Sequence, residues 1–244
     1  MSPPGDALGA GVGYRFTDRN GGYSPPPYSA LNLGTGLGDD PVAVAANRRL
    51  AVLACGSGGP GVAWMRQVHG PEVRYAGAPS PDGEPPECDA LYTDLPGLVL
   101  GVLVADCVPV LLADPQARLA GAAHAGREGL LAGVVSALIR ALIEAGARPD
   151  RIRAVIGPAI CGGCYEVPAQ LRDRVSVVVP EASCTTRAGT PGLDLAAGVR
   201  AQLGAAGVAA VEHDPRCTRE SAELYSYRRD GVTGRFAGLV WLGA

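Results

Sequence analysis

Two histidines and one cysteine lie where apolar stretches of the sequence give way to glycine or to charge. His69 lies in Gln67-Val68-His69-Gly70, His124 opens His124-Ala125-Gly126, and Cys107 follows Asp106 inside an apolar run. A charged side chain within such a run is costly unless it is paired. Two imidazoles and one thiolate are a protein ligand set for a catalytic zinc, which keeps a fourth position open for water or substrate and lowers the pKa of bound water.

The same three side chains are compatible with other chemistry. A mononuclear copper site uses two imidazoles, a thiolate and a weak axial methionine, for which Met1 and Met65 are the available residues. Without metal, Cys107 is a nucleophile with a histidine as its base. Taken singly, each is also typical of a core histidine or a small buried thiol. Because the intervals between positions 69, 107 and 124 match no zinc-finger pattern, spacing alone does not decide among these alternatives.

The composition excludes several classes of protein. The 244 residues include no lysine, so all 21 cationic side chains are arginines, which rules out a Schiff-base enzyme and a P-loop lysine. The formal net charge is −3 and no basic stripe is visible, so we expect no nucleic-acid partner. Three histidines cannot ligate a cluster of several coppers. A hydrophobic fraction of 47% indicates a globular chain.

The apolar runs and the cysteines bear on location. The longest apolar run, Leu98 to Ala105, is shorter than the roughly 20 residues that a membrane span needs. The N-terminus does not resemble a secretory signal, and the seven cysteines are an odd number. We therefore expect reduced thiols, a cytoplasmic location and no membrane partner. Both a monomer and a homodimer stay open.

Hydrophobic patterns predict strands interspersed with helices. Strands are expected over 62–68, 98–113 (as one or two), 119–123, 151–156, 208–212 and 236–242, and helices over 42–53, 129–145, 168–178 and 193–205. Asp40 and Pro41 form the cap and first position of the first helix. This irregular alternation predicts an α/β fold of the α+β kind, with mixed sheets covered by helices.

Cys161-Gly162-Gly163-Cys164 is a second candidate site. A Cys-x-x-Cys pair is either redox-active or half of a zinc site. No second pair with matching spacing exists, since Cys184 and Cys217 stand alone in the sequence. We therefore expect a structural or incidental role for this pair. Asp89 is expected to position a strand, and His213 to lie on the surface or in a loop.

Five motifs in order resemble those of the laccase-domain (YfiH-like) family. They are Trp64-x-x-Gln67-Val68-His69-Gly70, Ala105-Asp106-Cys107-Val108-Pro109-Val110, Ala123-His124-Ala125-Gly126, Ile156-Gly157-Pro158-Ala159-Ile160 and Ser226-Tyr227-Arg228-Arg229-Asp230. The resemblance implies a single layered α/β/β/α domain over residues 1–244, with His69, Cys107 and His124 around one zinc. One departure is Arg127-Glu128-Gly129, where the family commonly has Trp-Arg-Gly.

Members of this family have been described as polyphenol oxidases and as purine nucleoside phosphorylases with adenosine deaminase activity. The resemblance thus implies a zinc-dependent enzyme that converts adenosine, inosine or guanosine and phosphate into the base and ribose 1-phosphate, and that also deaminates adenosine. The alternatives are a copper-dependent polyphenol oxidase, a metal-free cysteine hydrolase, and a module whose metal serves only the fold.

The predicted site residues follow from these roles. The catalytic set is Cys107, His69, His124 and Asp106, the last as a candidate proton shuttle in deamination. The substrate-binding set is Arg48, Gln67, Tyr227 and Arg228. Arginine is the only fixed cation available for phosphate, and its fork suits that anion. Further arginines near the motifs are Arg66, Arg127 and Arg229.

Overall fold

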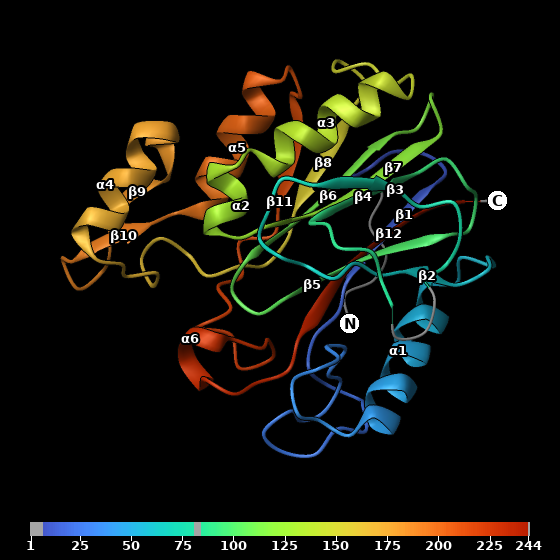
Figure 1. The fold of residues 1–244 in the computed structure, drawn as a ribbon, viewed down its shortest axis with the longest axis horizontal. Coiled ribbons are helices and arrows are strands. Elements are labelled where there is room, and N and C mark those ends of the chain that lie inside the picture. Colours follow the sequence, from blue (N-terminus) through green and yellow to red (C-terminus); the bar gives the residue numbers. More distant parts are fainter. Residues whose placement is uncertain (1–6, 81–83, 244) are drawn as a thin grey trace.

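The computed structural model describes residues 7–80 and 84–243. Met1, a candidate axial ligand, and residues 2–6, 81–83 and 244 of the expected 1–244 domain lie outside these ranges. Two sheets face each other, and helices cover their outer faces (Figure 1). The fold is therefore the predicted mixed α/β architecture, with the layer order helix, sheet, sheet, helix.

The smaller sheet has four strands in the order β1-β12-β5-β2. Its strands are β1 (Val12–Phe16), β12 (Phe236–Leu242), β5 (Val99–Val104) and β2 (Val62–Ala63). The larger sheet has six strands in the order β11-β8-β6-β7-β4-β3. Its strands are β11 (Ala210–His213), β8 (Arg153–Ile156), β6 (Val108–Asp114), β7 (Leu119–Ala125), β4 (Ala90–Thr93) and β3 (Val73–Tyr75). A separate pair joins β9 (Ser183–Thr185) to β10 (Pro191–Leu193).

Alternation of side chains along each strand divides the apolar residues between layers. In β12, Phe236 and Val240 enter the core between the sheets, whereas Leu239 and Trp241 enter the core under the first helix, α1 (Pro41–Cys55). On the opposite side, helices pack on the six-stranded sheet (Figure 1). They are α2 (Arg127–Leu131), α3 (Val134–Glu144) and α5 (Leu195–Ala205), whereas α4 (Ala169–Val178) packs against β9 and β10. The remaining helical turns are α6 (Tyr227–Asp230) and the 3-10 turn Pro180–Ala182.

Helix boundaries follow their capping residues. α1 begins at Pro41, and the Asp40 carboxylate accepts a hydrogen bond from the Val42 N–H at 2.9 Å, as predicted. The helix expected over 129–145 is instead two helices, because Gly133 adopts a left-handed φ of +76° that ends one and begins the next. No helix within the described ranges is both long enough and apolar enough to cross a membrane.

One strand prediction is wrong, and another is settled by the structure. The strand expected over 62–68 stops at Ala63, because the next backbone groups bond to a side chain: Trp64 donates to and accepts from the Ser80 hydroxyl. A regular strand over 62–68 would have placed Met65, a candidate axial copper ligand, on the same face as His69. Because the strand ends at Ala63, the two residues do not share a strand face. The run 98–113, predicted as one or two strands, is two strands, β5 and β6, which lie in different sheets and are joined by residues 105–107. Strands β1, β3, β4, β9 and β10 lie outside the predicted strand ranges.

Candidate functional site

The three predicted metal ligands converge in the fold. Cys107 lies at the crossing between β5 and β6, His124 lies on β7, and His69 lies in the irregular segment after β2. Their ligating atoms all lie within 4.8 Å of one another. The two imidazole rings meet edge to face, with centroids 4.7 Å apart. His124 is buried, Cys107 is half-buried and His69 is exposed, so the cluster is open on one side.

A buried carboxylate, Asp89, organises the two histidines. Its Oδ1 lies 2.7 Å from Nδ1 of His124, and it also accepts from the backbone N–H groups of Val68, His69 and Gly70 at 2.8 to 3.0 Å. This turn includes the left-handed φ of +62° at His69, a conformation that a non-glycine residue adopts when its surroundings hold it. The carboxylate thus fixes the ring of one ligand and the backbone of another.

The electrostatics of the cluster favour the ligating form of the thiol. Burial raises the pKa of Cys107, but the charges and hydrogen bonds of His124 and His69 outweigh it and lower the pKa to about 6. Burial lowers the pKa of His124, but Cys107 and Asp89 outweigh this and raise it to about 9. The two histidines thus favour the thiolate over the thiol, and the thiolate is the form that binds metal and attacks electrophiles.

Gly126 makes room for the ligands. A Cβ at this position would lie 2.7 Å from Cδ2 of His69 and 3.1 Å from Sγ of Cys107. The backbone there has an ordinary φ of −76°, so space and not conformation requires glycine. This cradle and the nitrogen and sulfur donors fit a tetrahedral zinc with three protein ligands and one open position. A Cys-His pair without metal uses the same atoms.

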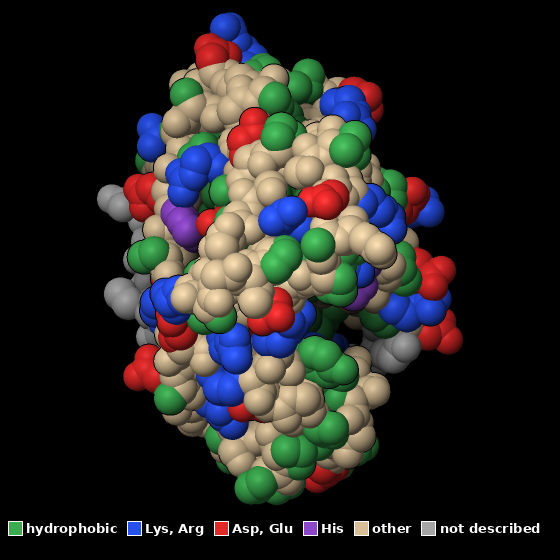
Figure 2. All heavy atoms as spheres, turned by 90° about the vertical axis from the view of Figure 1, so that its left-hand side faces the viewer, with side chains coloured by type: hydrophobic (Ala, Val, Ile, Leu, Met, Phe, Trp, Pro, Cys, Tyr) green, Lys and Arg blue, Asp and Glu red, His purple; other side chains and the backbone are tan. Residues whose placement is uncertain are grey.

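A cavity of about 720 Å³ opens directly onto the cluster. All three candidate ligands line it, together with four arginines: Arg48, Arg66, Arg228 and Arg235. Among the described residues of its lining, Asp106 supplies the one carboxylate. Figure 2 shows arginine side chains gathered beside a hollow on this face of the molecule. The cavity is thus suited to an anionic or partly anionic ligand.

The four predicted substrate-binding residues all line this cavity, but their side chains have different surroundings. Tyr227 is 62% exposed at the rim. The Arg228 guanidinium lies 5.0 Å from the ring centroid of Tyr165 and donates to the Glu166 carbonyl at 2.7 Å. Arg48 stacks on the Trp64 ring at 4.6 Å. These three side chains present aromatic surface and positive charge to the cavity.

Gln67 and Asp106 are engaged with the chain itself. The Gln67 amide donates to the Leu103 carbonyl and accepts from its N–H, at 2.8 and 2.9 Å. Asp106 accepts from the Thr218 hydroxyl through Oδ1 and from the Arg228 N–H through Oδ2, both at 2.6 Å. These contacts hold the walls of the cavity, and those of Asp106 favour a role in positioning Arg228. The shuttle role of Asp106 stays a prediction.

Nearness to the motifs in the sequence does not decide which of the other arginines line the cavity. Arg127 and Arg229 are not among the described residues of the lining. Arg229 donates to the carbonyls of Thr218, Ser221 and Leu224 and so holds a loop. Arg235, which sequence reasoning missed, does line the cavity. Its one signal in the sequence is a charge directly before an apolar strand, β12.

Comparison with known proteins agrees with this fold. A family model described as multi-copper polyphenol oxidoreductase laccase matches residues 13–243. A purine nucleoside phosphorylase of Streptomyces coelicolor is 56% identical over 232 residues, which is 95% of this chain and 96% of that protein.

Two solved structures are similar over nearly their whole length. A protein of Neisseria meningitidis has a TM-score of 0.87 at 36% identity and covers 99% of each chain. The YfiH protein of Bacillus licheniformis has a TM-score of 0.85 at 33% identity, with 95% of this chain and 92% of that chain covered. The layered fold and its two-histidine, one-cysteine cluster define an α/β protein of the laccase-domain class. The chain belongs to the multi-copper polyphenol oxidoreductase laccase family, as its motifs indicated.

Proposed function

We propose that the protein is a zinc-dependent purine nucleoside phosphorylase acting on adenosine, inosine or guanosine. The observation that carries the proposal is an open ligand set facing a cavity lined by four arginines and one carboxylate. The cavity volume of about 720 Å³ lies within the range of small-molecule sites. Relatives such as the Streptomyces coelicolor protein, named purine nucleoside phosphorylase, support the same activity.

His69, Cys107 and His124 would hold the metal. Zinc bound there supplies a positive charge and Lewis acidity beside the reacting substrate. The rest of the work falls to protein groups. Asp89 fixes the His124 ring by binding Nδ1, which leaves Nε2 for the metal side. Gly126 keeps the space between His69 and Cys107 clear.

Phosphorolysis forms a bond between a phosphate oxygen and C1′ of the ribose as the bond from C1′ to the purine nitrogen breaks. The base leaves with the electron pair and takes up a proton. The anionic nucleophile needs cationic donors, and guanidinium groups suit phosphate oxygens. We assign phosphate binding to Arg228 and Arg235, with Arg48 at the same cavity. Asp106 positions Arg228 by accepting its backbone N–H.

The purine itself needs an apolar face and a polar edge. Tyr227 at the rim and Tyr165 under Arg228 are aromatic residues of the cavity lining. We assign the base to these rings, because aromatic side chains offer large flat contact areas. Adenosine deamination is the second activity that we propose. Asp106 is the proton shuttle in that reaction, as the one carboxylate of the described lining.

Two other functions have specific support. The description of the family favours a copper-dependent polyphenol oxidase. Three histidines in the whole sequence are too few for several imidazole-bound coppers, which disfavours it. The lowered pKa of Cys107 beside His124 favours a metal-free cysteine hydrolase. Metal dependence separates both from the zinc enzyme.

The deciding experiment incubates metal-analysed protein with adenosine or inosine and phosphate, and separates the products by chromatography. We expect free base and ribose 1-phosphate, loss of activity with a chelator, and recovery with zinc. Cys107→Ala should abolish the reaction while the fold survives, and Cys184→Ala, which removes a thiol outside the cluster, should retain it. Activity unaffected by chelation, or phenol oxidation that requires copper, would overturn the proposal.

We also propose a cytoplasmic location and a single domain. The seven cysteines all lie within the described ranges and are free thiols, as expected in a reducing compartment. Purine nucleoside and phosphate are the proposed partners. The monomer and the homodimer are equally compatible with these observations.

A further inference from the structure

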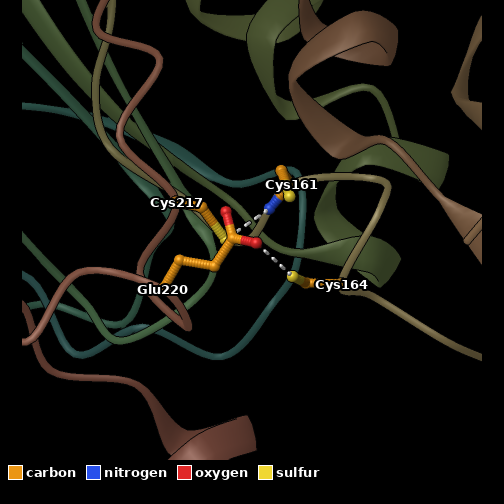
Figure 3. A group of neighbouring side chains, drawn as sticks. All are labelled: Cys161, Cys164, Cys217 and Glu220. Carbon is orange, nitrogen blue, oxygen red and sulfur yellow. Dashed lines mark hydrogen bonds between the residues drawn. The ribbon is translucent and has the colours of Figure 1, made fainter. Parts of the chain in front are cut away.

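A second cluster of metal-ligand side chains lies outside the catalytic cluster. Cys161, Cys164, Cys217 and Glu220 each offer one ligand atom, and these atoms all lie within 4.8 Å of one another. Figure 3 shows the four side chains gathered between two loops, with hydrogen bonds linking the loops. Spacing alone predicts a structural or incidental role for Cys161 and Cys164, because Cys217 is isolated in the sequence. The fold brings Cys217 beside the pair and favours the structural role.

Strand topology brings these distant residues together. β8 and β11 are parallel neighbours, so the loops that follow them leave the same edge of the sheet. A bridge between Ala159 and Cys217 continues the pairing beyond the strands, and the Thr218 N–H donates to the Ala159 carbonyl at 3.0 Å. The cysteine pair of one loop therefore faces Cys217 of the other.

Both loops present their ligands in the same way. The N–H groups of Cys164 and Tyr165 donate to the Cys161 carbonyl at 2.9 and 3.0 Å. In the other loop, the N–H groups of Glu220 and Ser221 donate to the Cys217 carbonyl at 3.1 and 2.8 Å. Each is a tight turn that places two ligands three positions apart on one side. Paired turns of the kind Cys-x-x-Cys are the usual source of ligands for structural zinc.

The surroundings are complementary to a negatively charged complex. Three thiolates and one carboxylate around a divalent cation leave an excess of negative charge. Arg187 donates to Sγ of Cys164 at 3.4 Å and pairs with the Glu220 carboxylate. Arg219 donates to the Cys164 carbonyl at 3.1 Å. The Cys161 N–H donates to Sγ of Cys217 at 3.4 Å. Such outer hydrogen bonds orient ligands and stabilise their ionised forms.

We propose that Cys161, Cys164, Cys217 and Glu220 form a second metal site, which binds Zn²⁺ through three sulfurs and one carboxylate oxygen. Four protein ligands leave no open position, so the site is structural. Zinc–sulfur bonds of about 2.3 Å require sulfurs about 3.8 Å apart, which is a contraction of about 1 Å at most from the present arrangement. Cys164 and Cys217 are buried, whereas Cys161 is half-buried and Glu220 is exposed, so two of the four ligand side chains have room to rotate.

This site would brace one wall of the cavity. Thr218 follows Cys217 directly and donates its hydroxyl to Asp106, which in turn accepts the Arg228 N–H. Ile160, which precedes Cys161, lines the cavity. A metal that joins the two turns therefore fixes the segments that position Arg228, without contacting substrate. The proposal does not depend on phosphorolysis.

Metal content of matched variants tests the site. Cys161→Ser should lower the zinc measured by elemental analysis by one per chain, both in the wild-type background and in a Cys107→Ala background, where the catalytic thiolate is absent. Cys184→Ser is the matched control, since its Sγ donates to the Gly162 carbonyl between the two cysteines yet lies outside the cluster. It should leave the zinc content unchanged. Glu220→Gln replaces a ligating carboxylate by a neutral amide and should weaken the affinity for zinc, measured as loss of the metal at a lower chelator concentration.

A second measurement needs no variant. In the zinc-loaded chain, Cys161, Cys164 and Cys217 should resist alkylation, and a chelator should expose them, as mapped by mass spectrometry. Cys184 should react equally in both samples. Equal zinc in the Cys161→Ser and parent chains, alkylation unaffected by the chelator, a Cys161–Cys164 disulfide in freshly purified protein, or iron in place of zinc would each overturn the proposal.

Discussion

Asp89 and His124 form a buried pair, with Oδ1 of the carboxylate 2.7 Å from Nδ1 of the ring. The same carboxylate accepts three backbone N–H groups of the turn that contains His69. One carboxylate thus holds two of the three candidate ligands in place, the ring of His124 and the backbone of His69. It determines which nitrogen of His124 faces Cys107, because Nδ1 is already occupied.

Asp89→Asn should weaken zinc binding about 10- to 100-fold, because an amide is a poorer acceptor and no longer favours one state of the His124 ring. Competition with a chelator measures the affinity, and phosphorolysis rates should fall in parallel at limiting zinc. Asp94→Asn, which changes an exposed carboxylate bonded to the Tyr75 hydroxyl, is the control. Equal zinc affinity in the two variants would argue against an orienting role for Asp89.

Gly126→Ala should reduce activity at least about tenfold while the chain stays folded. The new methyl group collides with His69 and Cys107. A displacement of about 1 Å at an active site can lower the rate by about two orders of magnitude. The backbone φ of −76° is ordinary for alanine. Gly204→Ala in α5, with nothing within 4 Å, is the control and should raise stability by about 0.5–1 kcal/mol. Thermal unfolding and steady-state rates separate the two effects.

Arg228→Gln should raise the KM for phosphate about 10- to 100-fold, because hydrogen bonds to charged groups contribute about 1.5–3 kcal/mol. The KM for the nucleoside should change less. Arg140→Gln on α3, outside the described lining of the cavity, serves as the control. An unchanged KM for phosphate would contradict the assignment of Arg228 and would leave phosphate binding to the other arginines of the cavity.

Asp114 predicts how stability depends on pH. Burial raises the pKa of this carboxyl, but the N–H groups of Ala117 and Arg148 and the charge of Arg151 outweigh it, and the pKa is lowered. A lowered folded-state pKa stabilises the fold above the unfolded value of about 3.9, and this stabilisation is lost as the pH falls through the folded value. Acid should therefore destabilise the protein from about pH 4 downward.

Asp114→Asn should lower the free energy of unfolding at pH 7 by about 1–3 kcal/mol, since a buried acceptor of four hydrogen bonds is weakened. The variant should also lose stability less steeply in acid than the parent. Asp150→Asn, an exposed carboxylate, should do neither. Denaturant titrations at pH 7 and pH 3 measure the free energy of unfolding of each protein. An equal loss of this free energy between the two pH values in the variant and the parent would contradict the prediction.

The mixed α/β fold expected from the sequence is confirmed, and the three candidate ligands His69, Cys107 and His124 lie together in it. Continuous apolar runs located β12 and, within 98–113, β5 and β6, and the Asp40-Pro41 cap located α1, because these signals are local. Boundaries failed where a side chain took over backbone hydrogen bonds, as Ser80 does at Trp64. Short strands such as β3 carry too few residues to form a pattern.

The groups that were missed depend on contacts across the chain. Asp89 organises the site only because β4 and β7 pair, with Ala90 opposite Ala123 next to His124. Cys217 becomes a ligand candidate only because β11 lies beside β8. Arg235 reaches the cavity only because β12 inserts between β1 and β5. No spacing along the sequence encodes these pairings.

The crossing at residues 105–107 has a mechanical consequence. Cys107 is the last residue of the crossing and directly precedes β6 of the larger sheet, while the crossing itself begins after β5 of the smaller sheet. Both imidazoles are fixed to the larger sheet, His124 by β7 and His69 through Asp89. Cys107 is also tied to the smaller sheet through the short crossing from β5, so a shift of one sheet over the other would disturb the position of the sulfur relative to the two rings. Repacking the interior between the sheets, far from any substrate, should alter metal affinity and turnover together.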